Sequence, residues 1–158
     1  MSFPLAYFIT WTTYGTWLPG DWRGWRKWKA GEQRPKPLLE AWCRNRMKEA
    51  AVVLNHTRRQ RVELVCGRHS AHRGWTLHAV NARSNHVHAV VTANAAPIAV
   101  RDQFKANATR VLREQPDPLM NEKVWTRGGD IDIIDDEDDL EQVVIYVMEA
   151  QDRMDRGK

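Results

Sequence analysis

The sequence predicts an α+β fold in which helices pack on a mostly antiparallel sheet. Three observations support this prediction. Short segments rich in β-branched and aromatic residues alternate with longer segments of helical periodicity. Two of the strand-like segments are separated only by residues 83–85, which suits a hairpin and is too short for a helical crossover. The helix-like segments begin or end at capping residues, prolines or glycines.

The first third of the chain predicts one strand, a long loop and a short helix. Residues 5–12 are mainly aromatic and β-branched, as is typical of a strand. Residues 14–37 predict a loop, because glycine and proline recur along the whole segment. A loop of this length inside a compact domain is usually functional or mobile. A short helix is predicted from Leu38 to about Glu49.

A second, longer helix is predicted from Thr57 to about Arg73. Thr57 and Gln60 fit a capping box, in which the two side chains satisfy free amides at a helix start. Gly74 suits the end of the helix, because glycine readily adopts the left-handed conformation found there.

Two strands, a helix and a bent strand or hairpin follow. Residues 75–82 and 86–92 predict the strands. Pro97 opens the helix. The apolar face predicted for this helix consists of Val100, Phe104, Ala108, Val111 and Leu112. Residues 123–134 predict a strand or hairpin that bends at Gly128-Gly129.

The last predicted element is a helix that begins at the acidic run Asp135–Asp139, where negative charge suits the helix dipole. Its predicted apolar stripe consists of Leu140, Val143, Val144, Val147 and Met148. With an extra helix near the start, the order is β-α-β-β-α-β-α. This order predicts a ferredoxin-like sandwich.

Composition sets broad limits on the function. A chain of 158 residues is most simply a single domain over 1–158. No run approaches the roughly 20 apolar residues of a membrane span, so no membrane partner is expected. The first residues lack the basic and apolar regions of a secretory signal, so we expect a cytoplasmic protein. Cys43 and Cys66 are too few for a disulfide framework.

The charge is unevenly distributed along the chain. Residues 1–127 carry 21 Lys and Arg against 9 Asp and Glu, a net charge of +12. Residues 128–158 carry 3 against 11, a net charge of −8. A basic body indicates a polyanionic partner such as nucleic acid. The alternative is solvated surface charge that happens to be uneven.

The segment Asn85-His86-Val87-His88 is the most informative. Alternate residues of a strand share a face, so His86 and His88 point the same way. Two neighbouring imidazoles on a rigid strand can hold one metal ion and leave positions open for water or substrate oxygens. The alternative is a hydrogen-bonded pair of histidines without a metal.

Tyr146 is the second candidate. On an ideal helix it lies roughly 120° from the centre of the apolar stripe, so it is poorly placed for the core. A phenol can attack a phosphorus atom that a metal has polarised and form a covalent phosphotyrosine. An ordinary surface tyrosine is the alternative.

Tryptophans alternate with basic residues in the long loop. The set consists of Trp17, Trp22, Trp25 and Trp28 with Arg23, Arg26, Lys27 and Lys29. Aromatic rings among basic groups suit the stacking of unpaired bases. The alternative is an apolar cluster that fixes the loop to the domain. A lesser basic set, Arg101, Lys105, Arg110, Lys123 and Arg127, could hold phosphates or form an ordinary solvated face.

Taken together, the chain resembles the small His-hydrophobic-His (HUH) single-tyrosine transposases, including the REP-associated tyrosine transposases. The resemblance runs from about Leu5 to Asp152. It is carried by residues 12–21, Asn85-His86-Val87-His88, Phe104-Lys105, Val124–Gly129 and Tyr146–Gln151, in this order and spacing.

The resemblance implies a ferredoxin-like fold with the histidines on a central strand and the tyrosine on a late helix. It also implies a divalent cofactor, Mg²⁺ or Mn²⁺, held by His86 and His88, and a single-stranded DNA substrate that contains a hairpin. Tyr146 would attack the scissile phosphate and leave a 5′-phosphotyrosine and a 3′-hydroxyl. A second 3′-hydroxyl would then complete strand transfer. Relatives include monomers and homodimers, so both states stay open.

One position departs from the family pattern. Family members complete the metal shell with a Gln about one helical turn past the tyrosine. Gln151 lies five positions on, about 140° around an ideal α-helix. We assign Gln151 as the third ligand by resemblance, with Glu149 or water as the alternatives.

Other readings of the same residues differ in function. A domesticated single-stranded DNA or hairpin-binding module would keep the fold and lose catalysis. A histidine-triad hydrolase needs a third alternating histidine where Val90 stands, and a two-motif phosphoesterase needs a second His-x-Ser/Thr motif. If the protein were purely structural, the uneven charge, the loop of tryptophans and basic residues, and the order of the histidines and the tyrosine would be separate coincidences.

Overall fold

The computed structural model describes residues 3–21, 23–27 and 31–150, without the side chains of residues 26, 27 and 150. Four strands form one antiparallel sheet in the order β4-β5-β1-β6. Their bounds are β1 Ala6–Thr12, β4 Thr76–Ala82, β5 His86–Thr92 and β6 Asp130–Ile134. This order confirms the predicted ferredoxin-like α+β fold and the central position of the strand that carries the two histidines.

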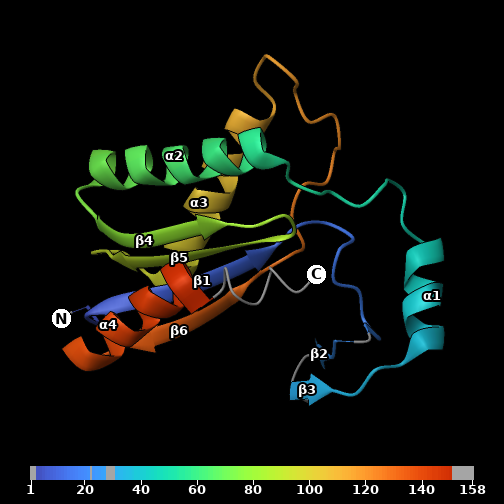
Figure 1. Ribbon diagram of the computed structural model, residues 1–158, viewed down its shortest axis with the longest axis horizontal. Helices are drawn as coiled ribbons and strands as arrows, with labels where there is room; N and C mark the ends of the chain where they lie inside the picture. Colours follow the sequence, from blue (N-terminus) through green and yellow to red (C-terminus); the bar gives the residue numbers. More distant parts are fainter. Residues whose placement is uncertain (1–2, 22, 28–30, 151–158) are drawn as a thin grey trace.

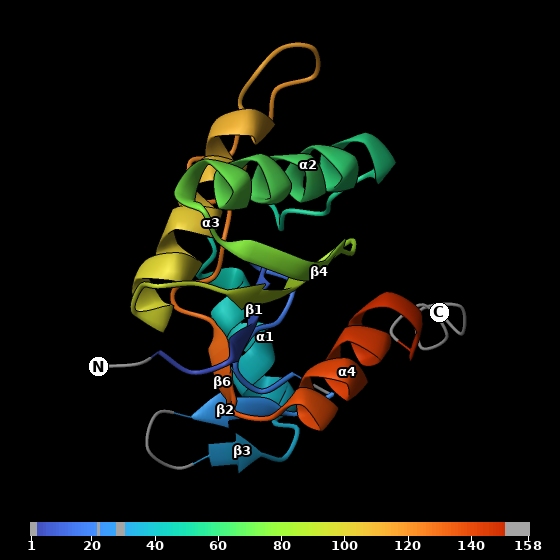
Figure 2. The same ribbon diagram turned by 90° about the vertical axis from the view of Figure 1, so that its left-hand side faces the viewer.

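Helices cover both faces of the sheet (Figures 1 and 2). One face is covered by α2 (His56–Arg73) and α3 (Pro97–Leu112). The other face is covered by α4 (Glu137–Ile145), which continues directly into the π-helical segment η1 (Tyr146–Ala150). Within the described residues, no helix combines the length and the apolar character needed to cross a membrane.

The alternation of side chains along the strands creates two different faces. In β1, Tyr7, Ile9 and Trp11 enter the larger core beneath α2 and α3. Phe8 and Thr10 point to the opposite face, beneath α4 and η1. Because the side-chain period of a strand is two, this register also decides which polar residues can meet the last helix.

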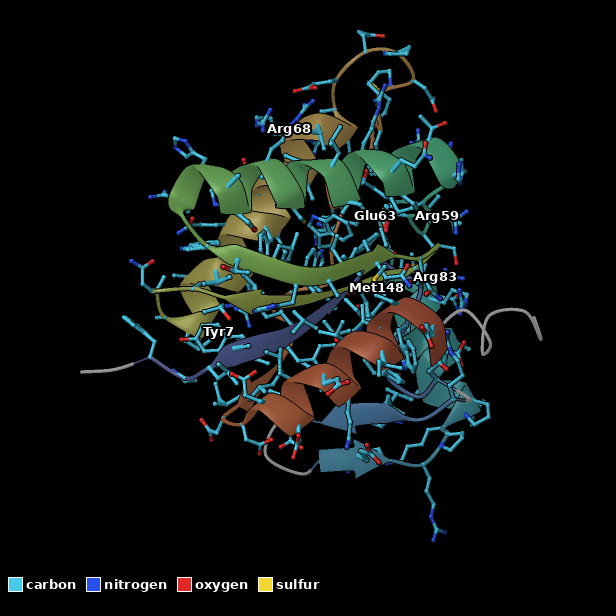
Figure 3. The ribbon with its side chains drawn as sticks, turned by 60° about the vertical axis from the view of Figure 1, so that its left-hand side comes forward. Tyr7, Arg59, Glu63, Arg68, Arg83 and Met148 are labelled. Carbon is cyan, nitrogen blue, oxygen red and sulfur yellow. The ribbon has the colours of Figure 1, made fainter. Side chains whose placement is uncertain are left out.

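Side chains from α2 fill the layer above the sheet, and one of them accepts a hydrogen bond from its edge strand (Figure 3). Val62, Val65 and Cys66 are buried, and burial raises the pKa of the Cys66 thiol to about 12. Glu63 reaches to the edge strand β4, where its carboxylate accepts a hydrogen bond from the Ala82 amide at 3.1 Å.

The predicted loop over residues 14–37 was only partly correct. It contains a two-stranded antiparallel sheet of β2 (Trp25–Lys27) and β3 (Gly31–Gln33). The short helix α1 (Pro37–Asn45) follows and lies to the side of the main sheet (Figure 1). It ends before Glu49, whose carboxylate instead accepts hydrogen bonds from the amides of Glu122 and Lys123.

Two predicted boundaries were also wrong in detail. The N-cap of α2 is Asn55, whose side chain accepts a hydrogen bond from the Arg58 amide, so Thr57 lies inside the helix. In residues 123–134 only β6 is a strand; Trp125 makes an isolated bridge to Thr13. The predicted helix end at Gly74 is confirmed by its left-handed conformation, with φ of 74°.

The last helix changes its winding at Tyr146. The first nine residues are α-helical and the next five are π-helical. Val147 is fully buried against Ala79 and Val90, whereas Met148 is 48% exposed. The predicted apolar stripe was therefore wrong at Met148, because its spacing assumed an α-helix throughout.

Candidate functional site

The two histidines lie side by side on the face of β5 that looks toward the last helix. Their ring centroids are 4.7 Å apart. His88 is buried and His86 is partly exposed. His88 lies in a row across the sheet, between Asn81 of β4 and Thr10 of β1. The structure thus brings together the pair that the alternation of the strand predicted.

The Nδ1 atom of each histidine already has a partner from a neighbouring residue. Thr10 Oγ1 lies 2.8 Å from Nδ1 of His88, and Asn85 Oδ1 lies 2.7 Å from Nδ1 of His86. Because an amide oxygen only accepts, the Nδ1–H of His86 donates, and the lone pair of the neutral ring is on Nε2. Such second partners orient imidazoles that bind metals.

Tyr146 stands over this pair at the start of η1. Its ring centroid lies 6.0 Å from that of His88 and 6.2 Å from that of Phe8, both in edge contact. The side chain is 37% exposed. The tyrosine and the histidines therefore meet within one chain, with the phenol accessible from outside.

The π-helical winding changes the geometry assumed for the third ligand. A π-helix bonds residues five apart, so one of its turns is longer than the 3.6 residues of an α-helix. The 140° separation from Tyr146 therefore does not apply over Tyr146–Ala150. Gln151 itself lies outside the described residues, and Glu149 is exposed. Across the described residues, no group of three or more His, Cys, Asp or Glu side chains could hold a metal.

A cleft of about 650 Å³ connects this centre with the tryptophan-containing loop. Its lining includes seven of the predicted site residues: Trp17, Arg23, Trp25, His86, His88, Arg127 and Tyr146. Residues far apart in the sequence thus border one cavity. Of the remaining predicted DNA-binding residues, Trp22 lies outside the described residues, and so do the side chains of Arg26 and Lys27.

The cleft wall formed by the loop is held by internal contacts. The Trp17 indole donates a hydrogen bond to the Gly24 carbonyl at 2.7 Å. The Arg23 guanidinium lies over the same ring, with its Cζ atom 4.0 Å from the ring centroid. Arg23 also forms a 2.7 Å ion pair with buried Asp21. Burial alone would raise the pKa of Asp21, but the hydrogen bonds and charge of Arg23 outweigh it and lower that pKa. Arg23 is therefore engaged in holding the wall.

Lys105 occupies a different position from the other basic candidates. Its ammonium donates to the carbonyls of Thr126 at 3.0 Å and Gly128 at 2.8 Å, behind the turn that carries Arg127. Burial, followed by the charge of Arg101, lowers the pKa of Lys105. Lys105 does not line the cleft, and the contact that the structure gives it is to the turn. Its predicted DNA contact stays a prediction.

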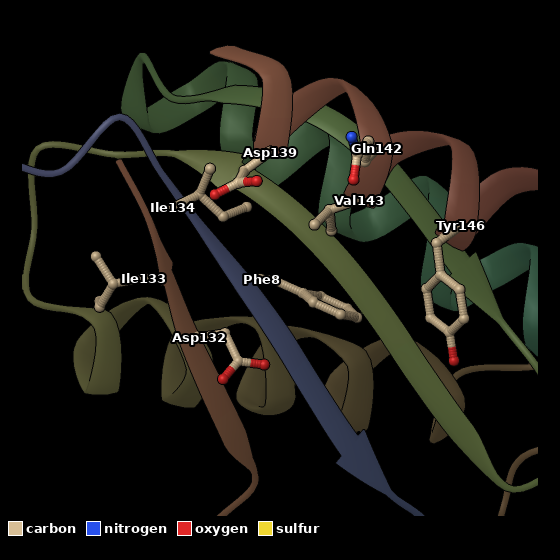
Figure 4. Close-up of a pocket in the computed structure, with 8 residues that line it drawn as sticks. All are labelled: Phe8, Asp132, Ile133, Ile134, Asp139, Gln142, Val143 and Tyr146. Carbon is tan, nitrogen blue, oxygen red and sulfur yellow. The ribbon is translucent and has the colours of Figure 1, made fainter. Parts of the chain in front are cut away.

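A second, shallower hollow of about 340 Å³ meets the first at Tyr146 (Figure 4). Phe8 and Val143 form part of its apolar lining, with Asp132 on β6 and Asp139 on α4 as the acidic groups. Carboxylates repel phosphate; the first cleft also has two, Glu32 and Asp130, but it sets Arg23 and Arg127 against them and adds indole rings, whereas the hollow has no basic residue among the described residues of its lining. The two sides of Tyr146 therefore differ in charge, and the first cleft is the one that suits a polyanion.

Three supporting residues were not predicted from the sequence. Thr10 and Asn85 contact the histidines, and Asn81 donates from its amide to the Val147 carbonyl at 2.8 Å. The signal was present in part, because each is a polar residue within or beside a strand of mainly apolar residues. Their partners follow only from the strand register.

Two comparisons with known proteins give matches. A protein-family model described as "Transposase IS200 like" matches residues 41–150. The solved structure of a REP-associated tyrosine transposase bound to a REP hairpin matches with a TM-score of 0.52 at 13% sequence identity. The match covers 90% of this chain and 63% of that chain, and it shows a shared fold. No curated protein matches the sequence.

Proposed function

Because this chain belongs to the IS200-like transposase family, we propose that it cuts and rejoins single-stranded DNA with Tyr146 as the nucleophile. Family membership assigns a transposase-type role in DNA processing. The observation that supports the proposed mechanism is the meeting of Tyr146, His86 and His88 in one cleft lined by indole rings.

The two histidines fit a divalent ion, Mg²⁺ or Mn²⁺. Their rings are adjacent, and Thr10 and Asn85 contact the Nδ1 atoms, so we propose Nε2 of each ring as the ligand atom. Two protein ligands leave coordination positions for water and phosphate oxygens, with Gln151 proposed as a third protein ligand. Such an ion, when bound, supplies Lewis acidity at the scissile phosphate.

The proposed reaction exchanges one phosphodiester for another. The Tyr146 phenol oxygen attacks phosphorus, loses its proton to solvent and forms a 5′-phosphotyrosine bond. The bond to the 3′-oxygen breaks, and that oxygen leaves as a 3′-hydroxyl after taking up a proton. Attack by a second 3′-hydroxyl reverses the sequence and releases the phenol. No external energy source is required.

The substrate side of the cleft supports DNA as the partner. The partly exposed rings of Trp17 and Trp25 can stack unpaired bases, and Arg127 can meet a phosphate. The related solved structure holds a REP hairpin. By analogy we propose a hairpin-containing single strand as the substrate, with Trp22, Arg26, Lys27 and Lys105 as further contacts.

The test is covalent capture on labelled hairpin oligonucleotides taken from the flanks of the protein's own gene. With Mn²⁺ or Mg²⁺, we expect a protein–DNA band on a denaturing gel. Tyr146→Phe and the double variant His86→Ala/His88→Ala should abolish it, as should chelation of the metal. Tyr14→Phe is the matched control, because Tyr14 packs against the core, and it should retain the band.

The outcomes separate the alternatives. A band that survives in Tyr146→Phe would refute Tyr146 as the nucleophile. DNA binding without any covalent band, in the wild-type protein with native flanks, would instead indicate a domesticated hairpin-binding module.

A further inference from the structure

The position of the Tyr146 phenol depends on its backbone. No described residue makes a hydrogen bond to its hydroxyl; the described contacts of its ring are the edges of Phe8 and His88, and 37% of the side chain is exposed. Edge contacts between aromatic rings are weak. What holds the π-helical turn therefore also decides where the nucleophile stands.

Among the described residues, Asn81 makes a side-chain hydrogen bond to that turn. Its amide donates to the carbonyl of Val147, the residue directly after Tyr146, at 2.8 Å. Both partners are buried, with Asn81 8% exposed and Val147 fully enclosed. A buried hydrogen bond of this kind is costly to remove, because the carbonyl is left without water to replace the donor.

Asn81 also lies directly beside the histidine centre. It pairs with His88 in the register of β4 and β5, so both side chains leave the same face of the sheet. One row of the sheet thus carries both a histidine of the proposed metal site and the residue that holds the tyrosine turn. The spacing between nucleophile and histidine follows from this rigid pair of strands.

From this geometry we infer that Asn81 is a positioning residue, which holds the π-helical turn through the Val147 carbonyl so that Tyr146 stands over His88. π-helical turns are rare and are frequent at functional sites. The kinetic consequence rests on the proposed function, whereas the structural consequence does not.

Two variants of Asn81 separate the effect of the hydrogen-bond donor from that of the shape of the side chain. Asn81→Ala removes both, and Asn81→Asp keeps the shape but replaces the donor with an acceptor that faces a carbonyl.

The first measurement does not depend on activity. The protein is labelled with 3-fluorotyrosine, and Tyr146→Phe assigns the ¹⁹F resonance of position 146. We expect both Asn81 variants to shift or broaden this resonance while those of Tyr7 and Tyr14 stay in place. An unchanged Tyr146 resonance in both variants would overturn the inference.

The second measurement is the single-turnover rate of the covalent adduct at saturating hairpin DNA and Mn²⁺. A misplaced nucleophile should lower this rate about 10- to 100-fold, with DNA affinity changed less than about twofold. Asn81→Asp should be no faster than Asn81→Ala. A wild-type rate in Asn81→Asp would show that shape alone matters and would also overturn the inference.

Asn107→Ala is the matched control. Asn107 likewise donates to a helix carbonyl, that of Gln103, at 2.8 Å. It lies on α3, which covers the opposite face of the sheet from α4 and η1. It should leave both the Tyr146 resonance and the rate unchanged. Equal rate losses in Asn107→Ala and Asn81→Ala would mean a general stability effect and overturn the inference. Absence of any adduct in the wild-type protein would refute the proposed function, and the resonance would still decide the role of Asn81.

Discussion

Thr10 is a small residue in the middle of β1 whose hydroxyl lies 2.8 Å from Nδ1 of His88. This contact therefore helps to orient the imidazole ring of His88. Partners of this kind raise the affinity of the ligand for a metal, and their loss typically costs 10- to 100-fold. A residue on the strand beside His88 can in this way affect the proposed metal site.

We predict that Thr10→Val weakens Mn²⁺ binding by about 10-fold or more, because it keeps the shape of the side chain and removes the hydroxyl. The measurement is a calorimetric Mn²⁺ titration of the protein without DNA. Thr10→Ser, which keeps the hydroxyl, should bind nearly as well as the wild type. Equal affinities for all three proteins would show that Thr10 does not support the site.

At the scale of elements, the turn before β6 fits closely against β1. Gly129 has φ of 140°, a conformation that side chains rarely adopt. A Cβ atom there would lie 2.8 Å from the Thr10 carbonyl oxygen and 3.3 Å from Cβ of Trp11. Both the backbone conformation and the close approach to β1 require glycine.

We predict that Gly129→Ala lowers the free energy of unfolding by about 2 kcal/mol or more, through strain and a forced shift of β1. Urea denaturation measures this change. The control is Gly67→Ala, in the interior of α2, where an added Cβ meets nothing within 4 Å. This substitution should stabilise the protein by up to about 1 kcal/mol. A Gly129→Ala protein as stable as the wild type would contradict the packing described for the turn.

The elements that could be predicted from the sequence are those that carry their own pattern. Strand alternation located β1, β4 and β5 to within about one residue and placed His86 and His88 on one face. The strands β2 and β3 have three residues each, too few to show a period. The π-helical turn could not be predicted either, because one of its supports, Asn81, lies on a different element.

Site residues were predictable where their role depends on a local pattern. The histidine pair is a local pattern, so it was predictable, whereas the role of Thr10 depends on the register between β1 and β5. Lys105 shows what a charge alone leaves open. Its charge predicts a phosphate contact, which stays a prediction, and its hydrogen bonds to the carbonyls of residues 126 and 128 are contacts that no helical pattern could reveal.

At the scale of the whole molecule, the uneven charge of the sequence also appears around the proposed nucleophile. The cleft on one side balances Glu32 and Asp130 with Arg23 and Arg127, whereas, among the described residues, the charged groups of the hollow on the other side are Asp132 and Asp139 alone. We propose that a single strand of DNA is therefore drawn along the first side. Its affinity should fall with salt, because bound phosphates release counterions.

We predict that Arg127→Ala weakens binding of single-stranded DNA and reduces the slope of log K against log salt by about 0.7, the loss of one phosphate contact. Fluorescence anisotropy at several salt concentrations measures the slope. Arg110→Ala removes a charge on α3 that pairs with Glu114 and does not line the cleft, and should leave the slope unchanged. An equal reduction of the slope by both variants would indicate that DNA binds through the overall positive charge of residues 1–127 and not through the cleft.

The three tyrosines of the chain occupy three different environments. Tyr7 is buried and donates to the Ala95 carbonyl, Tyr14 packs against the core, and only Tyr146 opens into the cleft. In the proposed reaction each chain can thus hold one DNA end at a time. Two ends held at once require two copies of the chain, and a single copy must release the first end before it makes a second cut. The stoichiometry of strand exchange in the proposed reaction therefore follows from having one tyrosine in the cleft.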